Sequence, residues 1–510
     1  MGPSRASVAT GHAATTAAAV HALDAGGNAV DMLIAAGWTA CVAEPIFCSP
    51  GGGGHALVRM RGRAPVVADF FAQTPRVRRV AGTDFYPIRG NFGCTEQEFH
   101  IGHGSAAVPG MVAGLFELHR RHAVLPMPVL AEPAAALARA GVQLNAVQRE
   151  ALEILEPIVR TDDVTARVFG LASKCAPLPA IGERARNPEL GGFIEATARL
   201  GAGDFYRGGL AARIAACQAG GGGHISIDDL ARYRVRWRRP MKWQLGEAAT
   251  VWSNPPPAFG GLMVALMTRA LERALPAGAG FGSRGHLEAL TSAMRDSEER
   301  RLALERPECA RDSRSLMRAF RRLEPAALRV ARGTTQISAR DRDGNIAGMT
   351  ISNGEGCGRV VPGCGFMLNN MLGEEDLNRT GFGLWPPGRR LSSMMAPTMI
   401  RHAGRDIVLG SGGSNRIRTA IAQVLANLMH FRMDLREAVF APRLHLEGEV
   451  LSIERDPAGW PADVEGWLIE RFPAAQRFPG RSLFFGGVHA VAGDAAAADP
   501  RRLGATWIDS

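Results

Sequence analysis

A run of four glycines between a helical segment and an alternating segment is the feature that most restricts the fold. Residues 11–45 repeat small and apolar residues with a helical period, and Gly26-Gly27 followed by Asn28 is typical of one helix ending and a capped helix beginning. In SPGGGGHALVRM (49–60) the glycines lead into a strand-like alternation that APVVADFF (64–71) continues. Two helices followed by a glycine-rich turn and a hairpin predict an α+β sandwich.

The pattern of the remaining chain changes near residue 334. Before this point the apolar spacing is mainly helical, and we expect helices within 108–170, 188–233, 260–275 and 284–304. From there TTQISARDRDGNIAGMTIS (334–352) alternates, and Asp343-Gly344 predicts a type I′ turn between two strands. We therefore expect a helix-rich first two-thirds and a strand-rich last third.

The charge pattern argues against a nucleic-acid partner. The formal net charge is +10, but all of the 59 basic residues except Lys174 and Lys242 are arginines, scattered among 49 acidic residues. The sequence contains no RNP motif, Cys/His finger or long basic arm, and no G-x-x-x-x-G-K-[ST] phosphate loop. We expect no nucleic-acid binding.

The cysteines and the N-terminal segment help to predict the cellular compartment and whether a metal site is present. The eight cysteines form no C-x-x-C pair, and the longest early apolar run, MLIAAGWTACVA (32–43), is too short to span a bilayer. No secretory signal is recognisable, so we expect a cytoplasmic protein with free thiols and no membrane segment. His100 and His103 with Glu98 could hold a metal, but histidines with ordinary packing roles are the favoured interpretation, and no metal or cofactor is expected.

The tripeptide Gly-Thr-Thr at 333–335 permits two interpretations. The simpler is a turn into a strand. The alternative is a concealed catalytic N-terminus: if the bond between Gly333 and Thr334 were cut, the new α-amine of Thr334, with a pKa near ~8, would be a base for its own hydroxyl. Because glycine has no side chain, Gly333 tolerates a strained backbone conformation and leaves room for the attacking Thr334 hydroxyl.

Many further segments match one known family in order along the chain. They are GGNAVD (26–31), EPIFCSPGGGG (44–54), GSAAVPGMVAGL (104–115), DFYRGGLA (204–211), NPPPAFGG (254–261), TTQISARDRDGNIAGMTIS (334–352), GFMLNNML (365–372), LSSMMAPT (391–398), GSGGSNRI (410–417) and APRLH (441–445). In these segments the chain resembles the gamma-glutamyltranspeptidases, which are N-terminal nucleophile hydrolases. The resemblance implies a four-layer αββα sandwich and self-cleavage into a large subunit, residues 1–333, and a small catalytic subunit, residues 334–510, associated as one body.

The same resemblance implies roles for individual residues. Thr334 matches the nucleophile and new N-terminus, and Ser352 matches a family threonine whose hydroxyl touches the nucleophile and assists processing. The pair Ser392 and Ser393 matches the serines that contact the substrate's α-carboxylate. Backbone N–H groups around Gly413 and Ser414 match the oxyanion hole, whose donors contribute about 3 kcal/mol to transition-state stabilisation.

Departures from the family pattern concern the substrate. Phe71 stands where glutamyl-specific members carry an arginine that clamps the α-carboxylate, and Met371 stands where they carry Gln or Glu. An acidic family residue is replaced by the run GEED, in which Glu374, Glu375 or Asp376 could hold the substrate's amino group. Arg416, Arg359 or Arg89 could supply an anion site from another direction.

The resemblance thus implies an autoprocessed amidohydrolase or acyltransferase. Its acyl donor is either a γ-glutamyl amide such as glutathione, or another carboxyl-bearing acyl amide as in the cephalosporin-acylase relatives. Phe71 in place of the family arginine favours the second class of donor. Water or an amine would accept the acyl group. A processing-dead binding homologue is the alternative, and a higher oligomer is left open.

Overall fold

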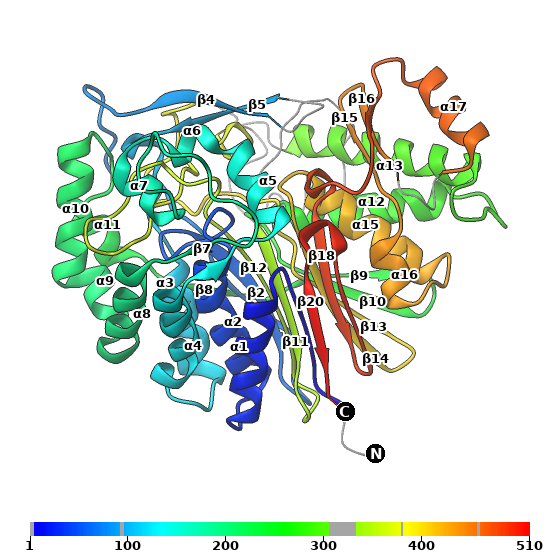
Figure 1. The fold of residues 1–510 in the computed structure, drawn as a ribbon. Helices are drawn as coiled ribbons and strands as arrows, with labels where there is room; N and C mark the ends of the chain where they lie inside the picture. The colour runs from blue at the N-terminus through cyan, green and yellow to red at the C-terminus, as the bar shows by residue number, and fades with distance from the viewer. Residues whose placement is uncertain (1–4, 92–95, 305–332, 379–380, 456–459, 510) are drawn as a thin grey trace.

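The computed structural model describes residues 5–91, 96–304, 333–378, 381–455 and 460–509 (Figure 1). Two antiparallel sheets lie face to face and helices cover both outer faces. The predicted four-layer αββα sandwich is therefore confirmed. Strands from both sides of residue 333 contribute to each sheet, so residues 1–333 and 334–510 are not separate domains.

The first sheet has seven strands. Their order is β20 (Ala505–Ile508), β1 (Ser7–Thr10), β11 (Thr335–Arg340), β12 (Ile346–Ser352), β2 (Gly53–Arg59), β3 (Val66–Phe70) and β8 (Arg236–Arg238). Strands β11 and β12 are the centre of this sheet and pair with Thr335 opposite Ile351. This register brings the start of β11 beside the end of β12.

The second sheet has six strands. Their order is β19 (Ala495–Ala498), β18 (Gly487–Ala492), β14 (Arg405–Gly412), β13 (Thr398–His402), β10 (Ala249–Ser253) and β9 (Met241–Leu245). Leu57 and Ile346 from the first sheet meet Met399, Val408 and Val491 from the second in one buried apolar cluster. Burial of this alternating apolar face holds the two sheets together.

Helices α1 (Ala13–Asp24), α2 (Ala29–Ala43) and α3 (Met111–His122) cover the seven-stranded sheet, with α4 (Met127–Ala140) packed on α2. Every residue of α2 is buried. Asn28 caps this helix by accepting from the N–H groups of Val30 and Asp31, which confirms the predicted helix restart. Helices α12 (Gly260–Ala274), α15 (Arg416–Met429) and α16 (Leu435–Phe440) cover the six-stranded sheet, and α13 (Arg284–Leu304) packs on α12.

Smaller elements complete the described fold. The other helices are α5 (Ala146–Ile154), α6 (Glu156–Val159), α7 (Asp163–Val168), α8 (Pro188–Leu200), α9 (Gly203–Arg207), α10 (Gly209–Gly221), α11 (Ile227–Arg232) and α17 (Ala462–Arg471), with 3₁₀ turns η1 (His103–Ser105), η2 (Glu375–Leu377), η3 (Leu483–Phe485) and η4 (Pro500–Arg502). The other strands are β4 (Tyr86–Asn91), β5 (Glu96–Ile101), β6 (Val142–Gln143), β7 (Arg184–Ala185), β15 (Leu444–Glu447), β16 (Val450–Glu454) and β17 (Gln476–Phe478). Within the described ranges, no helix is both long and apolar enough to cross a membrane.

The turn between β11 and β12 differs from the prediction. The strands do form a hairpin, but Arg340 pairs with Ile346 across a longer loop, so the predicted two-residue type I′ turn is wrong. A type I′ turn needs two residues with positive φ, and only Gly344, at 83°, has one in this loop. The Asp341 carboxylate closes the loop instead by accepting from the N–H groups of Asp343 and Asn345.

Candidate active site

Two hydroxyl groups converge on the carbonyl oxygen of Gly333. Thr334, which is 4% exposed, donates its Oγ1 hydrogen to this oxygen at 2.6 Å. Ser352, at the end of β12, donates its Oγ hydrogen to the same oxygen at 2.7 Å. The pairing of β11 with β12 places both side chains beside the Gly333–Thr334 peptide bond. Two donors on one carbonyl polarise it towards nucleophilic attack.

The Ser352 hydroxyl and the Gly333 amide are held by neighbouring groups. Ser352 Oγ accepts from the N–H of Gly354 at 2.9 Å, so its own hydrogen is directed to Gly333. The N–H of Gly333 donates to Glu355 Oε1 at 3.3 Å, and Asn370 donates to the other Glu355 oxygen at 3.0 Å. Glu355 could not be predicted from the sequence, because no motif distinguishes it from other loop carboxylates.

The glycine-rich loop at the end of β14 lies against Thr334. A Cβ atom on Gly412 would lie 1.9 Å from the carbonyl oxygen of Thr334, so only glycine fits there without a shift. Gly413 and Ser414 follow with φ values of 105° and 50° and lead into α15. The start of α15, which is the positive end of its dipole, therefore lies near Gly333 and Thr334, where it would favour a developing negative charge.

A hollow opens beside Thr334, with about 350 Å³ of empty space, open solvent included. Its lining is mainly apolar, with hydroxyl groups and one carboxylate: Phe71, Gly333, Thr334, Ser352, Met371, Glu374, Leu377, Ser393, Met394, Met395, Ser414 and Ile417. No arginine or lysine is among these lining residues. We call this space the threonine hollow.

The structure brings together most of the predicted site residues. Thr334, Ser352, Ser393, Ser414, Glu374, Phe71 and Met371 line the threonine hollow. Gly413 lines a second hollow that also borders Gly333. Ser392 lines neither space, and the exposed Glu375 faces a separate acidic hollow. The side chain of Asp376 lies outside the described residues.

Two of the three arginines suggested as an anion site lie elsewhere. Arg359 pairs with Asp84 at 3.3 Å and approaches Asp162 at 3.8 Å. Arg89 is exposed and lies 4.0 Å from Glu96. Neither lines the hollows beside Gly333, so only Arg416 stays a candidate.

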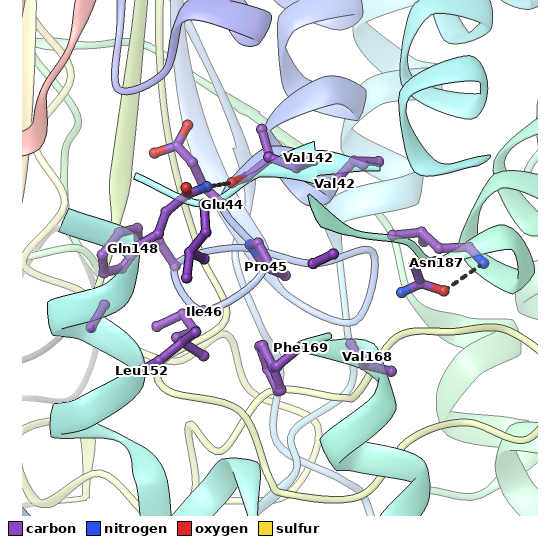
Figure 2. A pocket seen from close by; sticks show the side chains of 16 residues that line it. Val42, Glu44, Pro45, Ile46, Val142, Gln148, Leu152, Val168, Phe169 and Asn187 are labelled. Carbon is purple, nitrogen blue, oxygen red and sulfur yellow. Dashed lines mark hydrogen bonds between the residues drawn. The ribbon is translucent and has the colours of Figure 1, made fainter. Parts of the chain in front are cut away.

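A buried carboxyl group lies behind the nucleophile candidate. Thr335 Oγ1 donates to Glu44 Oε2 at 2.8 Å. Complete burial raises the pKa of the Glu44 carboxyl to about 7, although the Thr335 hydrogen bond and the charge of Arg502 act to lower it. Figure 2 shows this carboxylate at the edge of an apolar cavity, turned away from Leu152 and Phe169. Glu44 is thus held at the boundary between the site and the core.

The histidines considered for metal binding have other neighbours. The His100 ring stacks on Phe85 with centroids 4.8 Å apart. His103 Nδ1 lies 3.3 Å from the Gln218 amide nitrogen. Within the described part of the chain, His, Cys, Asp and Glu side chains form no group of three or more that could hold a metal ion.

Comparisons with known proteins agree with this architecture. A model of the family described as gamma-glutamyltranspeptidase matches residues 15–508. The chain is 30% identical over 461 residues to a glutathione hydrolase proenzyme of Pseudomonas aeruginosa, covering 84% of this chain and 80% of that protein. It is 29% identical over 521 residues to the Acylase ACY 1 proenzyme of Pseudomonas sp. strain V22, covering 96% and 90%.

A solved structure is similar over almost the whole fold. The cephalosporin acylase of Bacillus halodurans superposes with a TM-score of 0.78, covering 99% of this chain and 96% of that chain at 23% identity. At this identity the match shows a common fold.

Proposed function

Because the chain belongs to the gamma-glutamyltranspeptidase family, we propose that it cuts itself between Gly333 and Thr334 and then releases acyl groups from amides through Thr334. The observation that carries the proposal is the convergence of the Thr334 and Ser352 hydroxyls on the Gly333 carbonyl oxygen, at 2.6 and 2.7 Å. Relatives named glutathione hydrolase, acylase and proenzyme support an amidohydrolase or acyltransferase made as a precursor.

Self-cleavage begins with the attack of Thr334 Oγ1 on the Gly333 carbonyl carbon. The C–O bond forms, the hydroxyl proton passes to the departing Thr334 nitrogen, and the C–N bond breaks to leave an ester between Gly333 and Thr334. Water then hydrolyses this ester, which frees the Gly333 carboxylate and the Thr334 α-amine. Ser352 stabilises the charge that develops on the Gly333 oxygen.

The freed amine is the base of the catalytic cycle. It takes the Thr334 hydroxyl proton while Oγ1 attacks the substrate carbonyl, and the proton then goes to the leaving amine. The acyl ester on Thr334 is resolved by water or by an acceptor amine. Backbone N–H groups at Gly413 and Ser414, next to the start of α15, are the proposed oxyanion donors.

The lining of the threonine hollow favours a carboxyl-bearing acyl group other than unmodified γ-glutamyl. Phe71 and Met371 replace the expected anchors for the α-carboxylate and the α-amino group, and among the described residues no cationic side chain lines this space. A γ-glutamyl amide is the second candidate, because the 6%-exposed Glu374 lies where it could meet an α-ammonium group.

The intact mass of the purified protein beside its Thr334→Ala variant tests the proposal. We expect the native protein to yield two fragments meeting at Gly333/Thr334 and the variant to remain one chain without activity. Glutaryl and γ-glutamyl anilides would then be compared as donors. If both proteins remain single chains, or if the variant retains activity, the proposal is overturned and a binding homologue becomes the better description.

A further inference from the structure

A second hollow borders Gly333, and Thr334 is not among the residues that line it. Its empty space, open solvent included, is about 370 Å³, and it is lined by Gly333, Gly413, Phe47, Glu355, Arg416 and Arg502, with Ala151, Ile154, Leu155 and Leu483. We call it the arginine hollow. Gly333 lines both hollows, and the segment 413–417 contributes to each, so a molecule bound in either space would lie next to Gly333.

Arg502 presents a guanidinium with unused hydrogen-bond donors to this space. The residue is 5% exposed, and its Nε and Nη1 atoms have no hydrogen-bond partner among the described residues. Its guanidinium carbon lies 4.4 Å from the centre of the Phe47 ring, which orients the group without neutralising it. A buried cation with unused donors is unfavourable unless an anion completes its surroundings.

The lining of the arginine hollow carries two guanidinium groups and one carboxylate. Arg416, 2% exposed, adds a second guanidinium, whose Nε donates to the Phe484 carbonyl at 2.7 Å. Arg416 is also the first residue of α15, so the helix dipole adds to the positive potential. Glu355 is the carboxylate in the lining, and it already accepts from Gly333 and Asn370.

Three more carboxylates act on Arg502 from outside the hollow. These are Glu44, Asp499 and Glu150. None of them lies within 4.0 Å of the Arg502 guanidinium, and the two that are fully buried are engaged elsewhere: Asp499 with Arg443 and Arg501, and Glu44 with Thr335. They reduce the positive potential in the hollow without occupying it.

We propose that the arginine hollow is a carboxylate subsite, in which Arg502 and Arg416 hold a carboxylate beside the Gly333–Thr334 bond. Planar guanidinium groups match carboxylates in geometry and charge. The inference extends the proposed function, because the subsite would give a carboxyl-bearing substrate the anchor that no described residue of the threonine hollow supplies.

Two carboxylates could reach this subsite. One belongs to the substrate. The other is the carboxylate of Gly333 itself, which self-cleavage would create at the lining of the hollow. Phe47 and Ala151 also line the apolar cavity of Figure 2, so an apolar body attached to a substrate carboxylate has space next to the arginine hollow.

Glutarate is the probe for the subsite, and the uncleaved Thr334→Ala chain is the protein to titrate. In that background we expect Arg502→Met to weaken glutarate binding by about 10-fold or more, and Arg502→Lys to retain part of the affinity. Arg405→Met, at an exposed pair with Asp494, is the matched control and should leave binding unchanged. Because glutarate binding needs no Thr334 chemistry, its outcome is separate from that of the proposed function.

A second measurement needs no arginine variant, so its result cannot be due to a variant that misfolds. Glutarate should bind the Thr334→Ala chain at least about 10-fold more tightly than glutaramide, its neutral analogue, by isothermal titration. Equal binding of the two compounds, no binding of glutarate, or unchanged binding in a folded Arg502→Met variant would overturn the subsite.

The processed enzyme distinguishes the two sources of the carboxylate. If the substrate supplies it, Arg502→Met raises KM for a glutaryl anilide by about 10-fold or more and leaves KM for its methyl ester unchanged. If Gly333 supplies it, both donors are affected alike, and Arg502→Met lowers the Tm of the processed protein more than that of the Thr334→Ala chain. If Arg502→Met affects both donors alike and also lowers the Tm of both proteins by the same amount, the carboxylate subsite is contradicted.

Discussion

The hydroxyl of Ser352 has a partner on each side. It accepts from Gly354 at 2.9 Å and donates to Gly333 at 2.7 Å, so its hydrogen is directed at the oxygen that becomes negative during self-cleavage. We expect Ser352→Ala to slow self-cleavage by about 100-fold, as removal of one oxyanion donor does in other enzymes. Ser352→Thr retains the hydroxyl and is the control.

The decay of the intact chain after cell-free synthesis measures this effect on an electrophoresis gel. Mass spectrometry of the products checks that the cut stays at Gly333/Thr334. Cleavage of Ser352→Ala at the native rate would show that the Thr334 hydroxyl and the backbone suffice without Ser352.

Single residues of the site were predictable where a local pattern marks them. Thr334, Ser352 and Ser414 stand in the threonine-led strand segment or the glycine loop, and the structure brings their side chains to one hollow. Arg502 could not be predicted, because it is one of many scattered arginines. Its proximity to Gly333 arises only when η4 packs near the end of β14. Contacts between residues this distant in sequence depend on the complete fold.

At the scale of elements, η4 is tied to its neighbours by a buried charge cluster. Asp499, fully buried, lies 2.7 Å from Arg443 Nη2 and 3.1 Å from Arg501 Nη1, and it accepts from the N–H of Val488 on β18 at 2.8 Å. Burial acts to raise the pKa of the Asp499 carboxyl, but the two arginines lower it well below its usual range. The carboxylate therefore stays charged in the folded protein.

We expect Asp499→Asn to lower the free energy of unfolding by about 3–5 kcal/mol, because it leaves buried arginine charge without its partner. Asp494→Asn, which breaks the exposed pair with Arg405, should change it by less than about 1 kcal/mol. Urea denaturation in the uncleaved Thr334→Ala background measures both. Equal effects of the two substitutions would mean that the cluster adds nothing beyond a surface pair.

The elements with strong local signals were predictable. Periodicity and capping predicted α1, α2, α12 and α13, and the glycine run predicted the start of β2. The strands β1 and β20 were not predicted, because four residues carry too little alternation and both strands depend on pairing with distant parts of the chain. The Asp343-Gly344 turn was predicted wrongly, because the Asp341 carboxylate closes a longer loop.

At the scale of the whole molecule, the two proposed fragments are interleaved. In the seven-stranded sheet, β1 lies between β20 and β11, and β12 lies against β2 (Figure 1). In the six-stranded sheet, β13 lies against β10. Separation of the fragments would therefore break both sheets and expose the apolar cluster between them.

We expect the cleaved protein to elute in native buffer at the mass of the complete chain, 54.3 kDa, or a multiple of it, and to resolve into two fragments only in denaturant. Size-exclusion chromatography with light scattering, followed by electrophoresis of the same peak, measures this. Separate elution of the fragments in native buffer would contradict the interleaved arrangement.

The position of the proposed cut within the sheets also makes the mature protein harder to refold than the uncut chain. The uncut chain folds as a single molecule, because the peptide link keeps β11 close to the strands that precede it. After the cut, an unfolded molecule would have to recover its other half by diffusion, so refolding becomes a second-order process that slows on dilution. The mature protein would then stay folded because its rate of unfolding is low, and not because it refolds easily.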